Sequence, residues 1–106
     1  MKTIITLLLL LISNIAVSSE YVIDSSRNIL YDIESGLIQS DKDFIYATVI
    51  AGSIDGTYKD SNEFILDKTI CRGNVGYYTV NGISMTYPSA NYYTTQVIET
   101  ICKLGI

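Results

Sequence analysis

The stretch YYTVNGISMTYPSANYYTTQVIETICK, residues 77–103, holds the signals that decide the fold. Two short apolar runs flank Asn81-Gly82, a dipeptide typical of the tight turn of a β-hairpin. Pro88 ends the second run, and Ser89 can cap a helix that continues to the end of the stretch. The stretch therefore predicts a β-hairpin followed directly by a C-terminal helix.

The predicted helix has apolar side chains at helical spacing, which gives it one apolar face. These side chains are Tyr93, Val97, Ile98, Ile101 and Leu104. Cys102 lies on or near the same face. We therefore expect the helix to pack on a sheet and to turn Cys102 toward it.

Before the hairpin, apolar runs alternate with clusters of Gly, Asn, Asp and Ser, as in short antiparallel strands. With the hairpin, the expected strands are residues 21–24, 29–32, 44–51, 63–71, 77–80 and 83–87. The run 44–51 is almost continuously apolar and predicts a central strand with both faces covered. Residues 34–40 are expected to form a tight corner or one helical turn, and residues 52–62 an exposed loop around Asp55-Gly56. The predicted fold is α+β, a mostly antiparallel sheet of about five or six strands with the helix packed on it.

The N-terminus has the composition of a signal peptide. A basic residue precedes an apolar run at residues 4–12, which is too short to cross a bilayer because a span takes about 20 apolar residues. Small residues follow and allow cleavage after Ser18 or Ser19. We expect residues 1–19 to be this signal and residues 20–106 to be a single domain, the alternative being a buried N-terminal helix or strand.

Cys71 and Cys102 are the two cysteines of the chain. An exported chain permits one intramolecular disulfide between them, which would close a loop of about 30 residues and stabilise the fold by roughly 3 kcal/mol. A core this small usually needs such a cross-link. Two free buried thiols or an intermolecular bridge remain the alternatives.

The chain contains no histidine, which excludes Ser-His-Asp and Cys-His catalysis and histidine metal sites. Carboxylate pairs stand at Asp41 and Asp43 and at Asp32 and Glu34, but acids around a lysine before a strand are typical of a solvated turn. Asp41, Asp43 and residues 55–60 also lack the alternating ligands and closing Glu of a calcium loop. We expect no enzyme activity, no metal and no cofactor.

The predicted mature chain carries six basic and eleven acidic residues, a net charge of −5. Its basic residues stand singly among acids rather than in clusters. Nucleic acid and anionic membrane surfaces are therefore not expected partners. No second apolar run is long enough for a membrane span.

Tyrosines are concentrated in the final third of the chain. The candidates for contact with a partner are Tyr77, Tyr78, Tyr87, Tyr92 and Tyr93. Neighbouring residues cannot both point inward, so some of them should be exposed. Tyrosine is enriched in protein interfaces. The alternative is that they are ordinary strand formers at the edge of the core.

The order of several features resembles the surface-adhesin protein E-like family of small exported bacterial proteins. The matching features are Tyr31-Asp32, the apolar run 44–51, Cys71, and then Tyr87, Pro88, Ser89 and Cys102 in that order. Relatives commonly have Trp before the proline, whereas this chain has Tyr87. The family's founding adhesin is a lipoprotein, but no cysteine ends this signal, so we expect no lipid anchor.

The resemblance implies an antiparallel sheet whose terminal helix is held by a Cys71–Cys102 disulfide. For the named adhesin it also implies dimerisation and binding of host extracellular-matrix proteins and plasminogen. We therefore expect an exported, adhesin-like binding module, periplasmic or at the cell surface, that recognises a host matrix or envelope protein and can form a homodimer. The alternative is a small protein inhibitor of a lysozyme or protease, whose acidic loop 52–62 enters a basic cleft.

Intact mass measured with and without reductant and alkylation tests export and the cross-link together. We expect the purified exported protein to begin at Ser19 or Glu20 and to be two hydrogens lighter than the reduced chain. A full-length mass with two free thiols would overturn both expectations.

Overall fold

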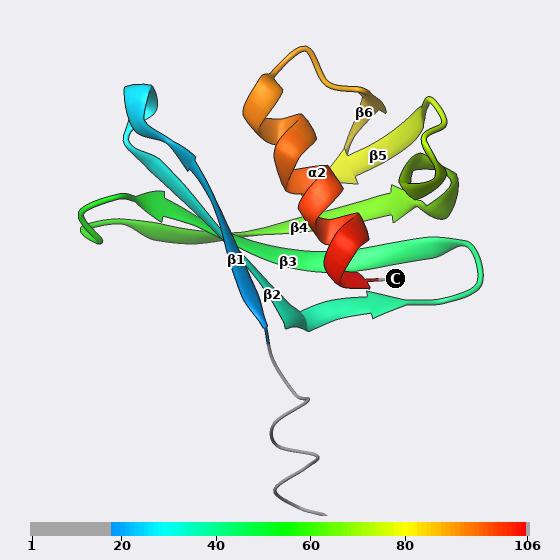
Figure 1. Ribbon diagram of the computed structural model, residues 1–106, viewed down its shortest axis with the longest axis horizontal. Coiled ribbons are helices and arrows are strands. Elements are labelled where there is room, and N and C mark those ends of the chain that lie inside the picture. The colour runs from blue at the N-terminus through cyan, green and yellow to red at the C-terminus, as the bar shows by residue number, and fades with distance from the viewer. Residues whose placement is uncertain (1–17, 106) are drawn as a thin grey trace, which may run out of the picture.

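The structure is a computed structural model that describes residues 18–105. Residues 1–17 of the predicted signal peptide therefore lie outside the described residues. Six antiparallel strands form one sheet in which each strand pairs with the next along the chain (Figure 1). The strands are β1 (Ser19–Asp24), β2 (Ile29–Ser40), β3 (Phe44–Ser53), β4 (Lys59–Asp67), β5 (Gly76–Val80) and β6 (Ile83–Tyr87).

Helix α2 (Tyr92–Gly105) packs across one face of the sheet, which we call the inner face (Figure 1). Two short 3-10 helices, η1 (Ser25–Arg27) and η2 (Lys68–Arg72), follow β1 and β4. The predicted α+β fold is confirmed. None of the helices within residues 18–105 is both long enough and apolar enough to cross a membrane.

The core lies between α2 and the inner face. The helix contributes Val97, Ile98 and Ile101, each with no exposed surface, which confirms the predicted apolar face. The sheet and η2 contribute Val22, Ile33, Ile45, Ala47, Val49, Phe64, Leu66, Ile70 and Tyr78. Burying an aliphatic or aromatic side chain of this size stabilises a fold by about 1.5–3 kcal/mol, so this one layer of contacts dominates stability.

Residues 34–40 were predicted to form a tight corner or one helical turn, but they belong to strand β2. It continues to Ser40 through an irregularity, because Ile33 pairs with Val49 while Ile38 pairs with Ala47. Extra residues on one strand bulge out of the ladder and strengthen its twist. Gly36, which suggested a corner, lies within this bulge, where glycine is well tolerated.

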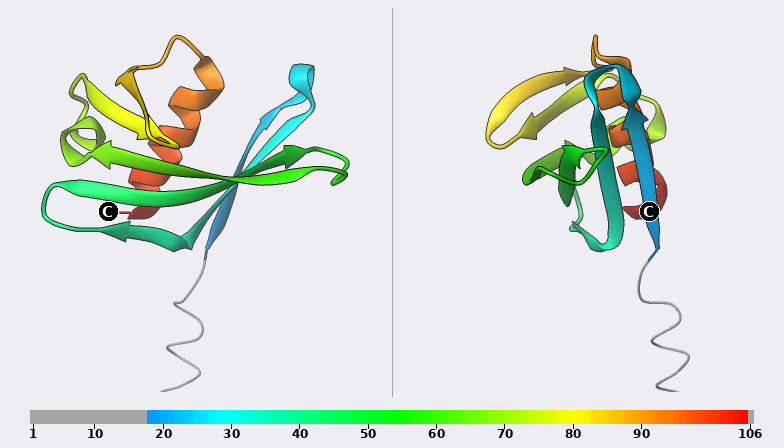
Figure 2. Two further views of the ribbon diagram at one scale, coloured as in Figure 1. Left: turned by 180° about the vertical axis from the view of Figure 1, so that it is seen from behind. Right: turned by 90° about the vertical axis from the view of Figure 1, so that its left-hand side faces the viewer.

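Strand β3 is central, as predicted, but only one of its faces is covered. Seen from behind, β3 and β4 pass in front of α2 with nothing over them (Figure 2, left). Phe44 and Tyr46 consequently remain 42% and 38% exposed on this outer face. The prediction of two covered faces is wrong because the described fold has one helix layer and no second one.

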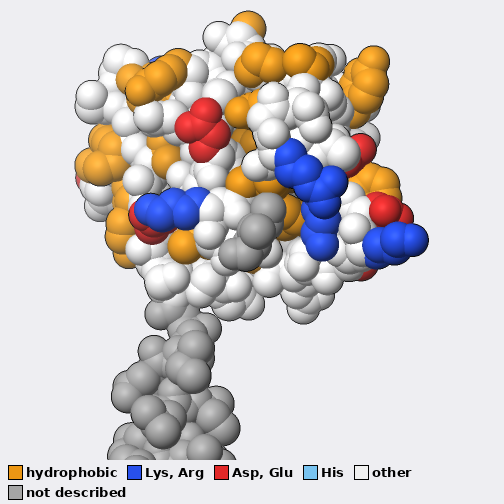
Figure 3. Space-filling view, turned by 45° about the vertical axis from the view of Figure 1, so that its right-hand side comes forward, with side chains coloured by type: hydrophobic (Ala, Val, Ile, Leu, Met, Phe, Trp, Pro, Cys, Tyr) orange, Lys and Arg blue, Asp and Glu red, His pale blue; other side chains and the backbone are white. Residues whose placement is uncertain are grey.

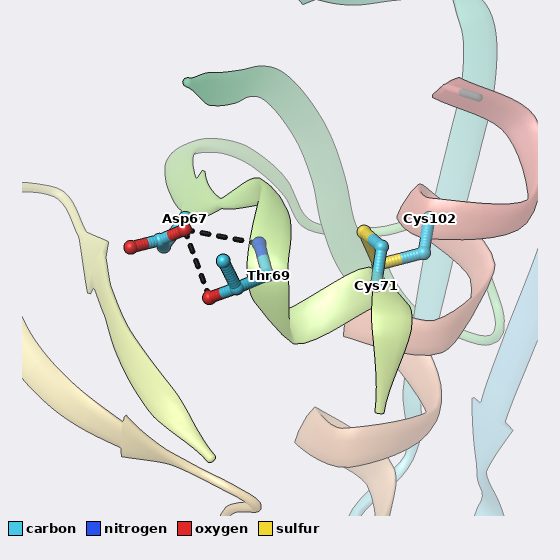
Figure 4. The surroundings of a disulfide bond; sticks show 4 residues. All are labelled: Asp67, Thr69, Cys71 and Cys102. Atoms are coloured by element: carbon cyan, nitrogen blue, oxygen red, sulfur yellow. Dashed lines mark hydrogen bonds between the residues drawn. A yellow bond between two sulfur atoms is a disulfide. The ribbon is translucent and has the colours of Figure 1, made fainter. Parts of the chain in front are cut away.

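The loop predicted at residues 52–62 is shorter than expected, because Lys59 already begins β4. The strand predicted to reach Cys71 ends at Asp67 instead. The carboxylate of Asp67 accepts hydrogen bonds from the backbone N–H and the hydroxyl of Thr69, both at 3.0 Å (Figure 4). This cap turns the chain into η2, so Cys71 lies on a short helix and not at a strand end.

Helix α2 starts three residues after the predicted Ser89 cap. Asn91 is the capping residue, since its side-chain oxygen accepts hydrogen bonds from the N–H groups of Tyr93 and Thr94 at 2.9 and 3.2 Å. Ser89 instead accepts a hydrogen bond from the N–H of Asn91 at 3.1 Å. A serine and an asparagine two residues apart are both good caps, so sequence did not separate them.

The Cys71–Cys102 disulfide joins η2 to α2 across a Cα separation of 5.3 Å, which confirms the predicted pairing (Figure 4). An ion pair of 2.6 Å between Lys103 and Glu20 connects the same end of the helix to β1. The helix is therefore fastened near its C-terminus to β1 and to η2, which follows β4.

Replacing both cysteines, Cys71→Ala with Cys102→Ala, should lower the free energy of unfolding by roughly 3 kcal/mol. The physical reason is that the open chain regains the conformational entropy of a loop spanning 31 residues. Urea unfolding followed by far-UV circular dichroism measures the change. Reductant should destabilise the native protein and leave the double variant unaffected. Equal stability of the disulfide-bonded native protein and the double variant would contradict the expectation.

Candidate functional site

The five candidate tyrosines do not form one surface. Tyr77 and Tyr92 are 72% and 66% exposed, whereas Tyr87 and Tyr93 are half-buried. Tyr78 is 2% exposed and stacks on Phe64, so it belongs to the core and has no surface for a partner. The expectation that adjacent tyrosines cannot both point inward is confirmed for both pairs. For Tyr77 and Tyr78 the physical cause is the alternation of β5, which turns Tyr77 to the outer face when Tyr78 faces the core.

The inner face of the sheet carries a hollow of about 560 Å³ where α2 no longer covers it. Along β3, Ile45, Ala47 and Val49 are buried in the core, whereas Ala51 and Ser53 line the hollow. We call this hollow the groove. Its apolar and aromatic side chains are Ile29, Tyr31, Tyr58, Phe64, Val80 and Met85. Its main polar side chains are Arg27, Ser53, Asp60, Asn62 and Thr94.

One wall of the groove is the arm formed by β1, η1 and β2, which rises beside α2 (Figure 1). Asp24 caps the start of η1, because its carboxylate accepts a hydrogen bond from the backbone N–H of Arg27 at 3.3 Å. It also accepts hydrogen bonds from the hydroxyl of Ser26 at 2.7 Å and from the side chain of Arg27 at 2.5 Å. Asp24 is 1% exposed, so the ion pair has one buried partner. This pair holds Arg27 against the groove.

Burial by itself raises the pKa of the Asp24 carboxyl. The hydrogen bonds from Arg27 and Ser26, with the charge of Arg27, outweigh it and leave the pKa below the ordinary 3.8. The pKa of Arg27 is raised, chiefly by its hydrogen bond to Asp24. Both groups are therefore charged at neutral pH.

The opposite wall is the β5–β6 hairpin, which supplies Val80 and Met85. Asn81 in its turn has a positive φ of 52° and accepts a hydrogen bond from the N–H of Glu63 at 2.8 Å. Its amide also donates to Asn62 at 3.0 Å. These bonds fasten the turn of the hairpin to β4 and so set the width of the groove.

Tyr58 stands at the open end of the groove and is 60% exposed. Its hydroxyl donates a hydrogen bond to Asp60 at 3.2 Å, and this bond and the charge of Asp60 raise the pKa of Tyr58. A side chain at Gly52 would clash with the carbonyl oxygen of Tyr58, so glycine is needed for the close approach of the two strands. Tyr58 lies in the segment predicted as a loop and was not among the tyrosines predicted to contact a partner.

The outer face of the sheet is a second exposed apolar surface. Phe44, Tyr46, Ile65 and Tyr77 are exposed there, and Tyr46 pairs directly with Ile65 across β3 and β4. The sequence did not reveal this surface, because a continuous apolar run predicts cover on both sides.

Of the carboxylates weighed for chemistry, Asp32 and Glu34 lie on strand β2, and Asp41 serves the turn before β3. Asp41 accepts hydrogen bonds from the N–H groups of Asp43 and Phe44 at 2.9 and 2.8 Å and from the hydroxyl of Tyr46 at 2.9 Å. The hydrogen bonds from Phe44 and Asp43 lower the pKa of Asp41. Within residues 18–105, no three acidic or cysteine side chains are arranged to hold a metal ion.

Three basic residues that stand apart in sequence meet at one hollow. Lys42, Lys68 and Arg72 line it together with Asp43 and Asp67. Basic side chains gather on this part of the surface in Figure 3, with acidic ones beside them. The fold therefore brings together cations that the sequence analysis treated as single charges, although nearby carboxylates offset most of their charge.

The chain matches no protein-family model, no curated protein and no solved structure. The resemblance to the surface-adhesin protein E-like family therefore stays a prediction, and the groove is interpreted from its own residues.

Replacing Asp24 with Asn should flatten the acid end of the stability profile. A carboxyl whose pKa is lower in the folded state stabilises the fold above about pH 4, and this stabilisation is lost as the pH falls through the folded pKa. Urea unfolding at several values between pH 6 and pH 2.5 should show a smaller loss of free energy in Asp24→Asn than in the native protein. Parallel profiles would show that Asp24 contributes nothing to the acid response.

Proposed function

We propose that the chain is an exported, adhesin-like binding module whose groove binds a portion of a protein partner. The observation that carries the proposal is the groove itself, an open hollow lined by Tyr31, Tyr58, Phe64 and Met85. Aromatic residues, Met and Arg are the residue types enriched in protein interfaces. A rigid sheet that presents them beside a few polar groups can bind a partner without ordering much of its own chain.

The charged groups of the groove favour binding over proton transfer. Arg27 is paired with Asp24, and Asp60 accepts a hydrogen bond from Tyr58. Charges that are already compensated are suited to orienting a polar group of a partner at the rim. Met85, which is 41% exposed, can adapt its shape to an apolar side chain.

The disulfide supports the exported part of the proposal. Disulfides persist in oxidising compartments such as the periplasm and the cell exterior, and reducing compartments keep thiols free. The Cys71–Cys102 bond therefore fits a protein that acts at or outside the cell envelope.

The inhibitor alternative is supported by the turn between β3 and β4, which projects from the sheet (Figure 1). Ile54 is 44% exposed in this turn, and Asp55 accepts hydrogen bonds from the N–H and hydroxyl of Thr57 at 3.1 and 2.8 Å. An ordered, protruding acidic turn is suited to entering a basic cleft. Inhibition assays on lysozymes and proteases test it, and no inhibition across them would exclude it.

Variants of Tyr58 and Tyr77, which are similarly exposed, test which face of the sheet binds the partner. With extracellular-matrix proteins and plasminogen as probes, Tyr58→Ala should weaken binding by about 30-fold, since an aromatic anchor in a protein interface contributes about 2 kcal/mol or more. Tyr77→Ala, on the outer face, should change affinity by less than about 2-fold. Surface plasmon resonance on the disulfide-intact proteins measures both.

If Tyr77→Ala weakens binding and Tyr58→Ala does not, the binding surface is the outer face. That result would support the prediction from sequence that Tyr77 contacts a partner. Absence of binding by the native protein to these probes and to envelope proteins would contradict the proposed function.

A further inference from the structure

The terminal strands of the sheet are β1 and β6, whereas every other strand has a neighbour on both sides over at least part of its length. An edge strand presents unpaired backbone N–H and C=O groups, to which another extended chain can bind. Natural sheets protect such edges with charges, cover or irregularity. The two edges of this sheet differ in this respect.

Strand β1 is a protected edge. It carries Glu20, which pairs with Lys103 of α2 at 2.6 Å, and it ends at Asp24, which pairs with Arg27. Helix α2 also packs against β1. Charge and cover therefore discourage a further strand from pairing here.

Strand β6 lacks these protections. Its sequence ISMTY is uncharged, and its first four residues are exposed. Ile83 is 63% and Met85 41% exposed, although both belong to the inner face, because α2 approaches β6 only at its Tyr87 end. The β5–β6 hairpin curves away from the helix (Figure 2, right).

The backbone N–H and C=O groups of β6 point alternately toward β5 and toward the free edge of the sheet. Asn81 and Gly82, with φ of 52° and 84°, form a two-residue turn that closes on the pair Val80 and Ile83. Hydrogen-bonded and non-hydrogen-bonded pairs alternate from this closing pair. Ser84 and Thr86 therefore direct their N–H and C=O groups away from β5, toward the free edge.

The edge also adjoins the groove. Met85 belongs to both, and Val80 and Phe64 continue the apolar lining across β5 and β4. A strand added to β6 would place alternate side chains beside Ile83 and Met85 on the inner face, and the others beside Ser84 and Thr86. Apolar residues suit the first set of positions and small polar residues the second.

We propose that the edge of β6 binds an extended, uncharged segment of a protein partner as a seventh strand, with apolar residues at alternate positions. This inference rests on the proposed binding function and names the form in which the partner is recognised. The backbone groups of Ser84 and Thr86 supply the hydrogen bonds, and Ile83 and Met85 supply the apolar contacts.

A matched pair of variants at Ser84 isolates the backbone contribution. Ser84→Pro removes the outward N–H but keeps the pairing with β5, which does not use that group, and proline is tolerated at such edge positions. Ser84→Ala removes the side chain and keeps the N–H. The probe is a library of random 12-residue peptides displayed on phage and selected on the disulfide-intact protein, followed by titration of an enriched synthetic peptide.

The enriched peptides should show alternating apolar residues. Ser84→Pro should weaken peptide binding at least 10-fold, whereas Ser84→Ala should change it less than 2-fold. Hydrogen exchange on the native protein provides a measurement that needs no variant, and the peptide should slow exchange of the Ser84 and Thr86 amides.

Binding that is insensitive to Ser84→Pro, without protection of these two amides, would overturn the proposal and leave the Tyr58 test of the groove standing. Failure to enrich any peptide would also overturn it, while binding of folded partners to the groove would be judged separately. Loss of a homodimer in Ser84→Pro would assign the edge to a second copy of the chain instead.

Discussion

The structure depends on the packing of one helix against one face of a six-stranded sheet. Val97, Ile98 and Ile101 are fully buried in this layer, and the Cys71–Cys102 bond prevents the helix from leaving it. A helix of 14 residues is about 21 Å long, which is shorter than strands such as β3. One short cover on a larger sheet leaves apolar surface open by necessity.

That incomplete cover produces each feature assigned to function. The groove is the uncovered end of the core face, the outer face has no helix layer among the described residues, and the first four residues of β6 stay exposed. Local hydrogen bonds keep these surfaces rigid. Asp24 holds the η1 arm on one side of the groove, and Asn81 holds the β5–β6 turn on the other. Preorganised surfaces of this kind bind partners at low entropic cost.

The fold was predictable where local signals were strong. Asn81-Gly82, Pro88 and the apolar helix face all lead to the observed hairpin and helix. Predictions failed where two local patterns competed. Gly36 is compatible with a corner or a bulge, and Asp67 with strand alternation or a cap. In each case a tertiary contact decided, since β2 had to continue along β3 and η2 had to bring Cys71 to the helix.

The sequence by itself determined the class of fold, the hairpin next to the helix and the single cysteine pair, because turn chemistry, periodicity and cysteine count are local or numerical properties. It did not determine which tyrosines are exposed, where the groove lies or which edge is free. Tyr58, Tyr77 and Tyr78 are chemically equal in sequence, yet one lines the groove, one faces outward and one is buried. Only the tertiary structure separates them, since exposure depends on how far a short helix reaches across a twisted sheet.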